Sequence, residues 1–96
     1  MTAGRHSVRD LRLVVIGAYV TDCIIRTPHL PAWGEEYEAR SVRTSPGGKA
    51  MNQAVGLARL GAQVTAVGVV GDDGVGKDIV AALEQEGVDV GYLECP

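Results

Sequence analysis

Short runs of hydrophobic residues separated by polar turns predict strands in three parts of this chain. The run 11–17 is nearly continuous and β-branched at its centre, which is typical of a strand buried on both faces of a parallel sheet. The run 64–70 has the same character, and the run 88–93 begins a last strand. These three segments are the expected core strands.

Helical periodicity fills the spaces between the core strands. After Gly48, apolar residues recur at spacings of three and four up to Gly61, which has the position of a helix-ending glycine. The segment 78–86 has the same periodicity and stops at Gly87. We therefore expect one helix before the second core strand and one before the third.

The segment between the first core strand and the first helix has a different pattern. Residues 22–27 favour a short strand, 28–34 form a loop with two prolines, and 36–44 alternate weakly between polar and apolar. This pattern predicts an exposed antiparallel hairpin, which we term the flap.

The resulting order is strand, flap, helix, strand, helix, strand. Strand–helix–strand units of this kind pair in parallel with right-handed crossovers, so the fold class is α/β. Ligands of such sheets bind at the carboxyl ends of the strands. Asp22 and the turn 47–52 both lie toward that end.

Composition restricts the function further. The chain has 96 residues and a net charge of −3, which suits one small domain and disfavours a nucleic-acid surface. Its most basic stretch lies in residues 1–10, which we expect to be a disordered tail. No apolar run is long enough to span a bilayer, and no signal peptide is recognisable. Two cysteines make no disulfide framework, so the cytoplasm is the expected compartment.

The segment 71–78 matches the opening of a phosphate-binding P-loop, G-x-x-x-x-G-K, between a strand and a helix. Asp78 replaces the Ser or Thr that holds Mg²⁺, and Asp72 and Asp73 would face the polyphosphate with negative charge. A structural strand-to-helix turn is the preferred interpretation, with a P-loop phosphohydrolase as a weaker alternative.

The strongest candidate for a binding site is the start of the first helix. Gly47 and Gly48 let backbone approach a ligand closely, and the helix start offers unpaired N–H groups. Lys49 and Asn52 are three residues apart and share a helical face. With Asp22 as a hydroxyl acceptor, these residues could hold a small polyhydroxylated molecule. No metal-ligand spacing and no Ser-His-Asp set is present, so no catalytic or metal residue is assigned.

These residues resemble the ribokinase-like (PfkB) carbohydrate kinases. The segments that carry the resemblance are 46–54 (PGGKAMNQA), 57–62, 68–76, 17–22 and 31–35. The resemblance covers nearly the whole chain from Leu11 to Cys95. It implies the N-terminal part of a three-layer α/β/α fold in residues 11–96, with a small β lid inserted after the first core strand.

The resemblance also implies a function and a site. The family transfers the γ-phosphoryl group of ATP, with Mg²⁺, to a hydroxymethyl group of a sugar or nucleoside. By that resemblance Asp22, Gly48, Lys49 and Asn52 hold sugar hydroxyls, and Gly47 and Gly48 form the hinge of the lid. Residues 23–28 and 36–45 would be the lid strands, which in many members also form the contact of a homodimer.

The chain departs from the family pattern in two places. Val20 stands where ribokinases tend to carry Asn, which puts ribose itself in doubt. The family's C-terminal signature, with its catalytic Asp and most ATP contacts, is not among these 96 residues. We therefore expect no catalysis by these residues alone and an uncovered apolar face of the sheet. The alternative function is a non-catalytic module that acts through dimerisation or partner binding by its lid strands.

Overall fold

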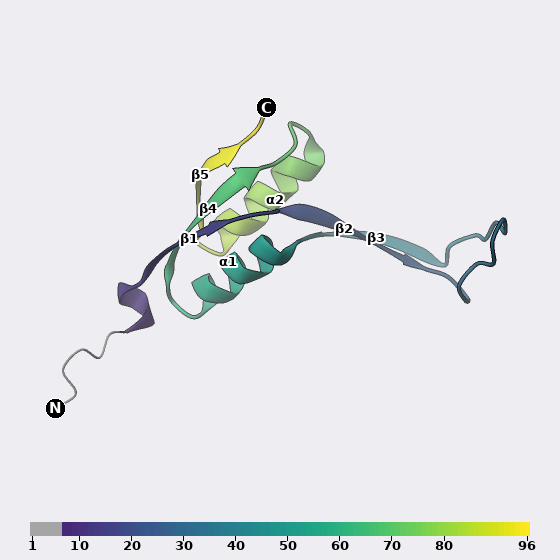
Figure 1. The fold of residues 1–96 in the computed structure, drawn as a ribbon, viewed down its shortest axis with the longest axis horizontal. Helices are drawn as coiled ribbons and strands as arrows, with labels where there is room; N and C mark the ends of the chain where they lie inside the picture. Colours follow the sequence, from purple (N-terminus) through teal and green to yellow (C-terminus); the bar gives the residue numbers. More distant parts are fainter. Residues whose placement is uncertain (1–6) are drawn as a thin grey trace.

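The computed structural model describes residues 7–96, which form a small α/β body and a long hairpin (Figure 1). The order of elements confirms the predicted α/β class. The elements are η1 (Val8–Asp10), β1 (Arg12–Ile16), β2 (Val20–Arg26), β3 (Ser41–Gly47), α1 (Lys49–Arg59), β4 (Gln63–Val69), α2 (Gly74–Gln85) and β5 (Asp89–Glu94). Neither α-helix of the described residues has the length and apolar content that crossing a membrane requires.

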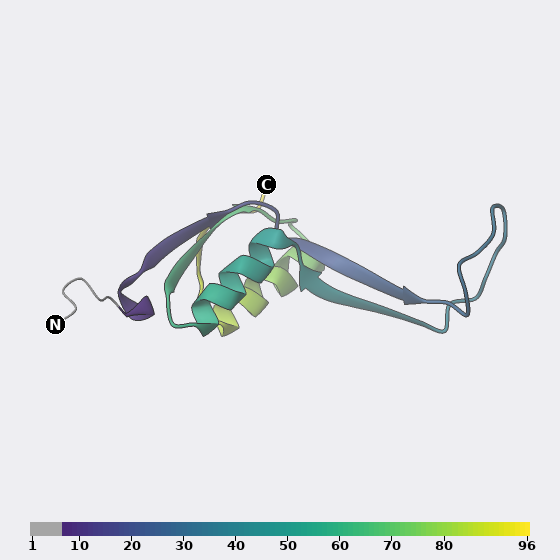
Figure 2. The same ribbon diagram turned by 60° about the horizontal axis from the view of Figure 1, so that its bottom comes forward.

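The body is a parallel sheet of three strands in the order β1-β4-β5. Helices α1 and α2 lie side by side on one face of this sheet (Figure 2). Residues 7–96 therefore make the sheet and one helical layer of the expected three-layer fold.

The other face of the sheet carries apolar side chains that the described residues leave in solvent. The exposed residues of this face are Val14, Ile16, Val69 and Tyr92. The cross-strand pairs Ile16–Val67 and Val67–Tyr92 put these positions on one face. This confirms the expected uncovered face.

The core lies between the sheet and the two helices. Ala54 of α1, Ala66 of β4 and Leu83 of α2 are fully buried at its centre. Alanines on the facing surfaces of α1 and β4 let helix and sheet approach closely, while Leu83 supplies volume. The buried Tyr19 hydroxyl donates to the Val15 carbonyl at 2.6 Å, and burial raises the pKa of this phenol. Tyr19 thereby ties the start of the flap to the first core strand.

The predicted flap is the antiparallel pair β2–β3, which projects far from the body (Figure 1). Its strands are Val20–Arg26 and Ser41–Gly47, against the expected ranges of about 23–28 and 36–45. The pairing of β2 with β3 begins at Val20. Its partner is Gly47, the residue directly before the N-cap of α1. It ends at Arg26, whose carbonyl accepts from the Arg40 amide at 2.7 Å, shortly before Pro28 interrupts the backbone donors.

The N-terminal tail differs in part from the expected disorder. Residues 7–10 hold a short 3₁₀ turn, η1, closed by a capping box in which Ser7 and Asp10 bind each other's backbone amides. Residues 1–6, the remainder of the expected tail, lie outside the described part of the chain.

Candidate functional site

The glycine turn joins the flap to α1 through a backbone shape that an L-residue rarely adopts. Gly48 is the N-cap of α1 and has φ of +99°. A Cβ at this position would lie 2.6 Å from the Ala18 carbonyl oxygen, because the turn passes directly over the end of β1. No side chain caps the helix, so N–H groups of its first turn stay open to a ligand.

Asp22 and Gly47 meet across the flap. Asp22 pairs with Ser45 and Gly47 pairs with Val20, so Asp22 and Gly47 are diagonal neighbours on one face of the hairpin. A Cβ at Gly47 would overlap the Asp22 carboxylate, which shows that this carboxylate lies directly against the glycine backbone. The structure thus brings the predicted acceptor and the predicted hinge together, although they are 25 residues apart in sequence.

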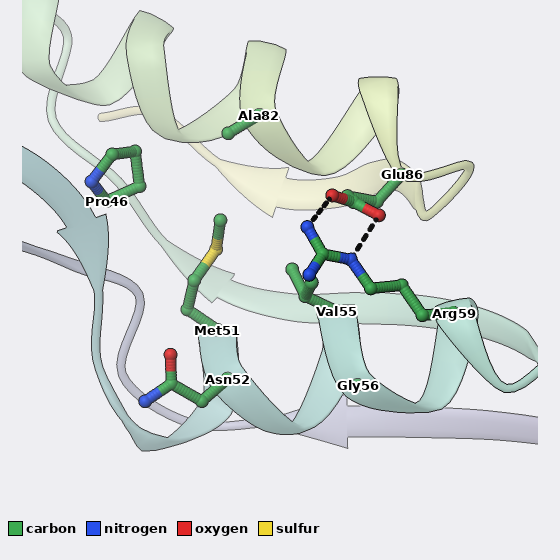
Figure 3. Close-up of a pocket in the computed structure, with 8 residues that line it drawn as sticks. All are labelled: Pro46, Met51, Asn52, Val55, Gly56, Arg59, Ala82 and Glu86. Atoms are coloured by element: carbon green, nitrogen blue, oxygen red, sulfur yellow. Dashed lines mark hydrogen bonds and ion pairs between the residues drawn. The ribbon is translucent and has the colours of Figure 1, made fainter.

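Lys49 and Asn52 occupy the first turn of α1 as the sequence predicts. Both are exposed, and the Asn52 amide donates to the Gly48 carbonyl at 3.0 Å. The Asn52 side chain lines a groove between α1 and α2, at the end near Pro46 of β3 (Figure 3). Asn52 therefore faces this groove, whereas the Asp22 carboxylate lies against Gly47 on the flap.

The groove itself was not predicted from the sequence. It encloses about 410 Å³, and its lining comprises Pro46, Met51, Asn52, Val55, Gly56, Arg59, Ala82 and Glu86. Arg59 and Glu86 close its other end with a two-pronged ion pair at 2.6 and 3.0 Å (Figure 3). The hydrogen bond from Arg59 lowers the pKa of the Glu86 carboxyl. No local pattern signals a pair 27 residues apart.

The loop 71–77 does not fit a nucleotide phosphate. Asp73 caps α2, its carboxylate accepting from the Gly76 amide at 2.8 Å, so a carboxylate stands where a phosphate would bind. The Cys95 thiol donates to the Gly71 carbonyl at 3.4 Å from the other side. Desolvation and the nearby Asp72 carboxylate raise the pKa of this thiol. The structure therefore favours the structural turn over the P-loop.

The same cap corrects the expected start of the second helix. The helix begins at Gly74 instead of residue 78, since Asp73 satisfies the first-turn amide and offsets the weak helix propensity of Gly74 and Gly76. Within residues 7–96, no group of three or more His, Cys, Asp or Glu side chains could hold a metal ion.

Comparison with known proteins agrees with this architecture. The model of the pfkB family carbohydrate kinases matches residues 10–95. The ribokinase of Bacillus subtilis (strain 168) is 45% identical over 82 residues, which are 85% of this chain and 28% of that protein.

Solved structures show the same relationship. The ribokinase of Arabidopsis thaliana complexed with ribose and ATP superposes with a TM-score of 0.78 at 36% identity, covering 88% of this chain and 28% of that one. The ribokinase of Cryptococcus neoformans var. grubii serotype A in complex with ADP gives a TM-score of 0.76 at 33% identity, covering 91% and 27%.

The parallel sheet, the flap after its first strand and the glycine turn define the N-terminal part of a ribokinase-type α/β fold. This chain belongs to the pfkB family of carbohydrate kinases. It spans about 28% of the length of the B. subtilis relative.

Proposed function

We propose that these residues form the acceptor-binding side of an ATP-dependent kinase that phosphorylates a hydroxymethyl group of a sugar or nucleoside. The contact of the Asp22 carboxylate with the Gly47 backbone carries this proposal, because it places a strong hydroxyl acceptor at the base of the flap. The glycine turn beside it leaves open backbone donors for the same ligand.

Each remaining residue of the proposed site has a physical role. Gly48 exposes backbone to the sugar, and the Lys49 ammonium and the Asn52 carboxamide donate to sugar oxygens. Gly47 and Gly48 form the hinge on which the flap closes over the acceptor. For closure, the flap and the Asn52 side chain must both move toward one ligand. Two consecutive glycines at the base of the flap permit the movement of the flap.

ATP and Mg²⁺ are the proposed co-substrate and metal, bound largely by residues outside these 96. Among residues 7–96, the one loop that resembles a nucleotide-binding loop is 71–77, which holds the Asp73 carboxylate at its helix start and does not fit a triphosphate. Phosphoryl transfer needs positioned phosphates, metal ions and a group that accepts the hydroxyl proton. We therefore propose that these 96 residues do not catalyse the reaction alone.

A pair of kinase assays tests this proposal. The 96-residue chain is expected to show no turnover of ribose, fructose or adenosine above a control without protein. A chimera, in which residues 10–95 replace the matching segment of B. subtilis ribokinase, is expected to phosphorylate at least one of these acceptors. Turnover by the chain alone, or an inactive chimera with the far-UV circular dichroism of a folded kinase, would contradict the proposal.

An alternative function is dimerisation or partner binding by the flap without catalysis. One face of the flap carries Ile25 and Val42 as a cross-strand pair, and both side chains are exposed. An exposed apolar pair on a projecting hairpin is a surface that a second flap could cover.

Sedimentation equilibrium of the 96-residue chain tests the alternative. If the flap holds a dimer, Ile25→Arg is expected to convert the dimer to monomer, because an arginine at this position would be buried without a partner. Ile24→Arg is the matched control, since Ile24 lies on the opposite face. A chain that sediments as a monomer without any substitution would exclude dimerisation as its function.

A further inference from the structure

The face of the flap that carries Asp22 also carries two arginines. Cross-strand partners share a face, and Ile24 pairs with Arg43 while Arg26 pairs with Ser41. Successive residues of a strand alternate between faces, so Asp22, Ile24 and Arg26 point the same way. Arg26 and Arg43 thus lie on the face where Asp22 meets Gly47.

The two arginines line a hollow of their own. It encloses about 250 Å³ and is lined by Ile24, Arg26, Ser41 and Arg43. Ile24 is the one apolar residue of this lining, and the Ser41 hydroxyl adds a further donor.

Neither guanidinium of this hollow has an acidic partner. In the part of the chain that the structure describes, the one ion pair within 4.0 Å joins Arg59 to Glu86. Among the residues of β2 and β3, Asp22 is the only acid and Arg26 and Arg43 are the only bases. Two like charges on diagonal neighbours repel each other, so an anion between them is favoured.

The spacing matches a single small ligand. Asp22 and Arg43 are diagonal neighbours, at about 7–8 Å between backbone positions, and the arginine side chain is long enough to reach across that distance. A hydroxyl held by Asp22 and an anionic group held by Arg43 can therefore belong to one sugar. Arginine suits this task because its planar fork binds carboxylate and phosphate oxygens in pairs.

We propose that Arg26 and Arg43 determine specificity by binding a carboxylate or phosphate group of the acceptor, so that the preferred acceptor is an anionic sugar derivative. This inference rests on the proposed acceptor site at Asp22. It predicts that the anionic group lies toward the tip of the flap and the reacting hydroxymethyl group toward the body.

Nuclear magnetic resonance of the 96-residue chain tests the inference. The signals observed are the side-chain Nε–Hε groups of the arginines and the backbone amides of Asp22 and Lys49. The probes are fructose, fructose 1-phosphate and gluconate, which separate a neutral sugar from a phosphate and from a carboxylate. The variants are Arg26→Gln and Arg43→Gln. Arg40→Gln is the matched control, since Arg40 comes directly before β3, the strand of Arg43, and does not line the hollow.

Fructose 1-phosphate or gluconate is expected to shift the Arg26 and Arg43 signals saturably, together with the amides of Asp22 and Lys49. Each of the two test variants should weaken that binding about tenfold or more, and Arg40→Gln should leave it unchanged. Whichever anion binds more tightly identifies the source of the charge.

Three results would overturn the inference, and they differ in what they exclude. If fructose shifts Asp22 and Lys49 as strongly as the anions do and the arginine signals stay still, the proposed function stands and the anion site is wrong. If the anions shift only the arginines and no sugar reaches Asp22 or Lys49, the acceptor site itself is wrong. Equal losses in all three arginine variants would show non-specific attraction and also exclude a built site.

Discussion

Gly48→Ala is expected to lower the free energy of unfolding by about 2 to 3 kcal/mol, which corresponds to a fall in melting temperature of about 10 °C or more. Two effects combine at this position. The φ of +99° is strained for any residue with a Cβ, and that Cβ would lie 2.6 Å from the Ala18 carbonyl oxygen. Relief requires the turn between β3 and α1 to move, which also moves the flap.

The measurement is thermal and urea unfolding followed by far-UV circular dichroism. Tryptophan fluorescence is a poor probe because Trp33, the only tryptophan, is fully exposed at the tip of the flap. Gly56→Ala is the matched control, since Gly56 lies within α1 and an added Cβ there would meet no atom of a neighbouring segment within 4 Å. It should raise stability by about 0.5 to 1 kcal/mol. Equal stability of Gly48→Ala and the unsubstituted chain would contradict the strained turn.

Asp22→Asn is expected to raise the KM for the acceptor about 10- to 100-fold in the chimera with B. subtilis ribokinase. A hydrogen bond to a charged acceptor contributes about 1.5 to 3 kcal/mol, and the substitution removes the charge while it keeps the shape. Lys49→Ala and Asn52→Ala should weaken acceptor binding in the same direction. Stability should change little, because Asp22 is exposed and makes no ion pair in the described residues.

Steady-state kinetics measures this effect, with the acceptor varied at saturating ATP and ATP varied at saturating acceptor. Asp89→Asn is the control, since Asp89 is exposed at the start of β5, lies beside Arg12 and Gln63 at the starts of the core strands, and loses the same charge. An unchanged KM for the acceptor in Asp22→Asn would remove Asp22 from the site. A change of KM for ATP alone would assign the residue to the other substrate.

Features set by neighbouring residues were predictable from the sequence. The three core strands and α1 lie within one or two residues of their expected positions, because burial pattern and helical periodicity act over a few residues. Gly61 and Gly87 end their helices with φ of +103° and +79°, as the sequence indicated. The start of α2 was missed, since Gly74 and Gly76 argue against a helix that the Asp73 cap supports.

Features set by distant residues required the folded chain. The sequence indicated a flap, yet the register between its strands decides which side chains of β3 share a face with Asp22 and Arg26, and a shift of one residue would turn Arg43 to the opposite face. Likewise, the Arg59–Glu86 pair depends on how α1 packs beside α2. Neither follows from local pattern.

The proposed acceptor site shows both kinds of feature. The glycine turn, Lys49 and Asn52 lie in one short segment of the sequence and could be predicted from it, because a helix start is a local structure. The contact of Asp22 with Gly47 depends on hydrogen bonds between strands that a loop of 14 residues separates. Strand pairing over such a loop is determined by the packing of the whole chain, so only the tertiary structure could place the Asp22 carboxylate, the proposed hinge at Gly47 and Arg43 on one surface.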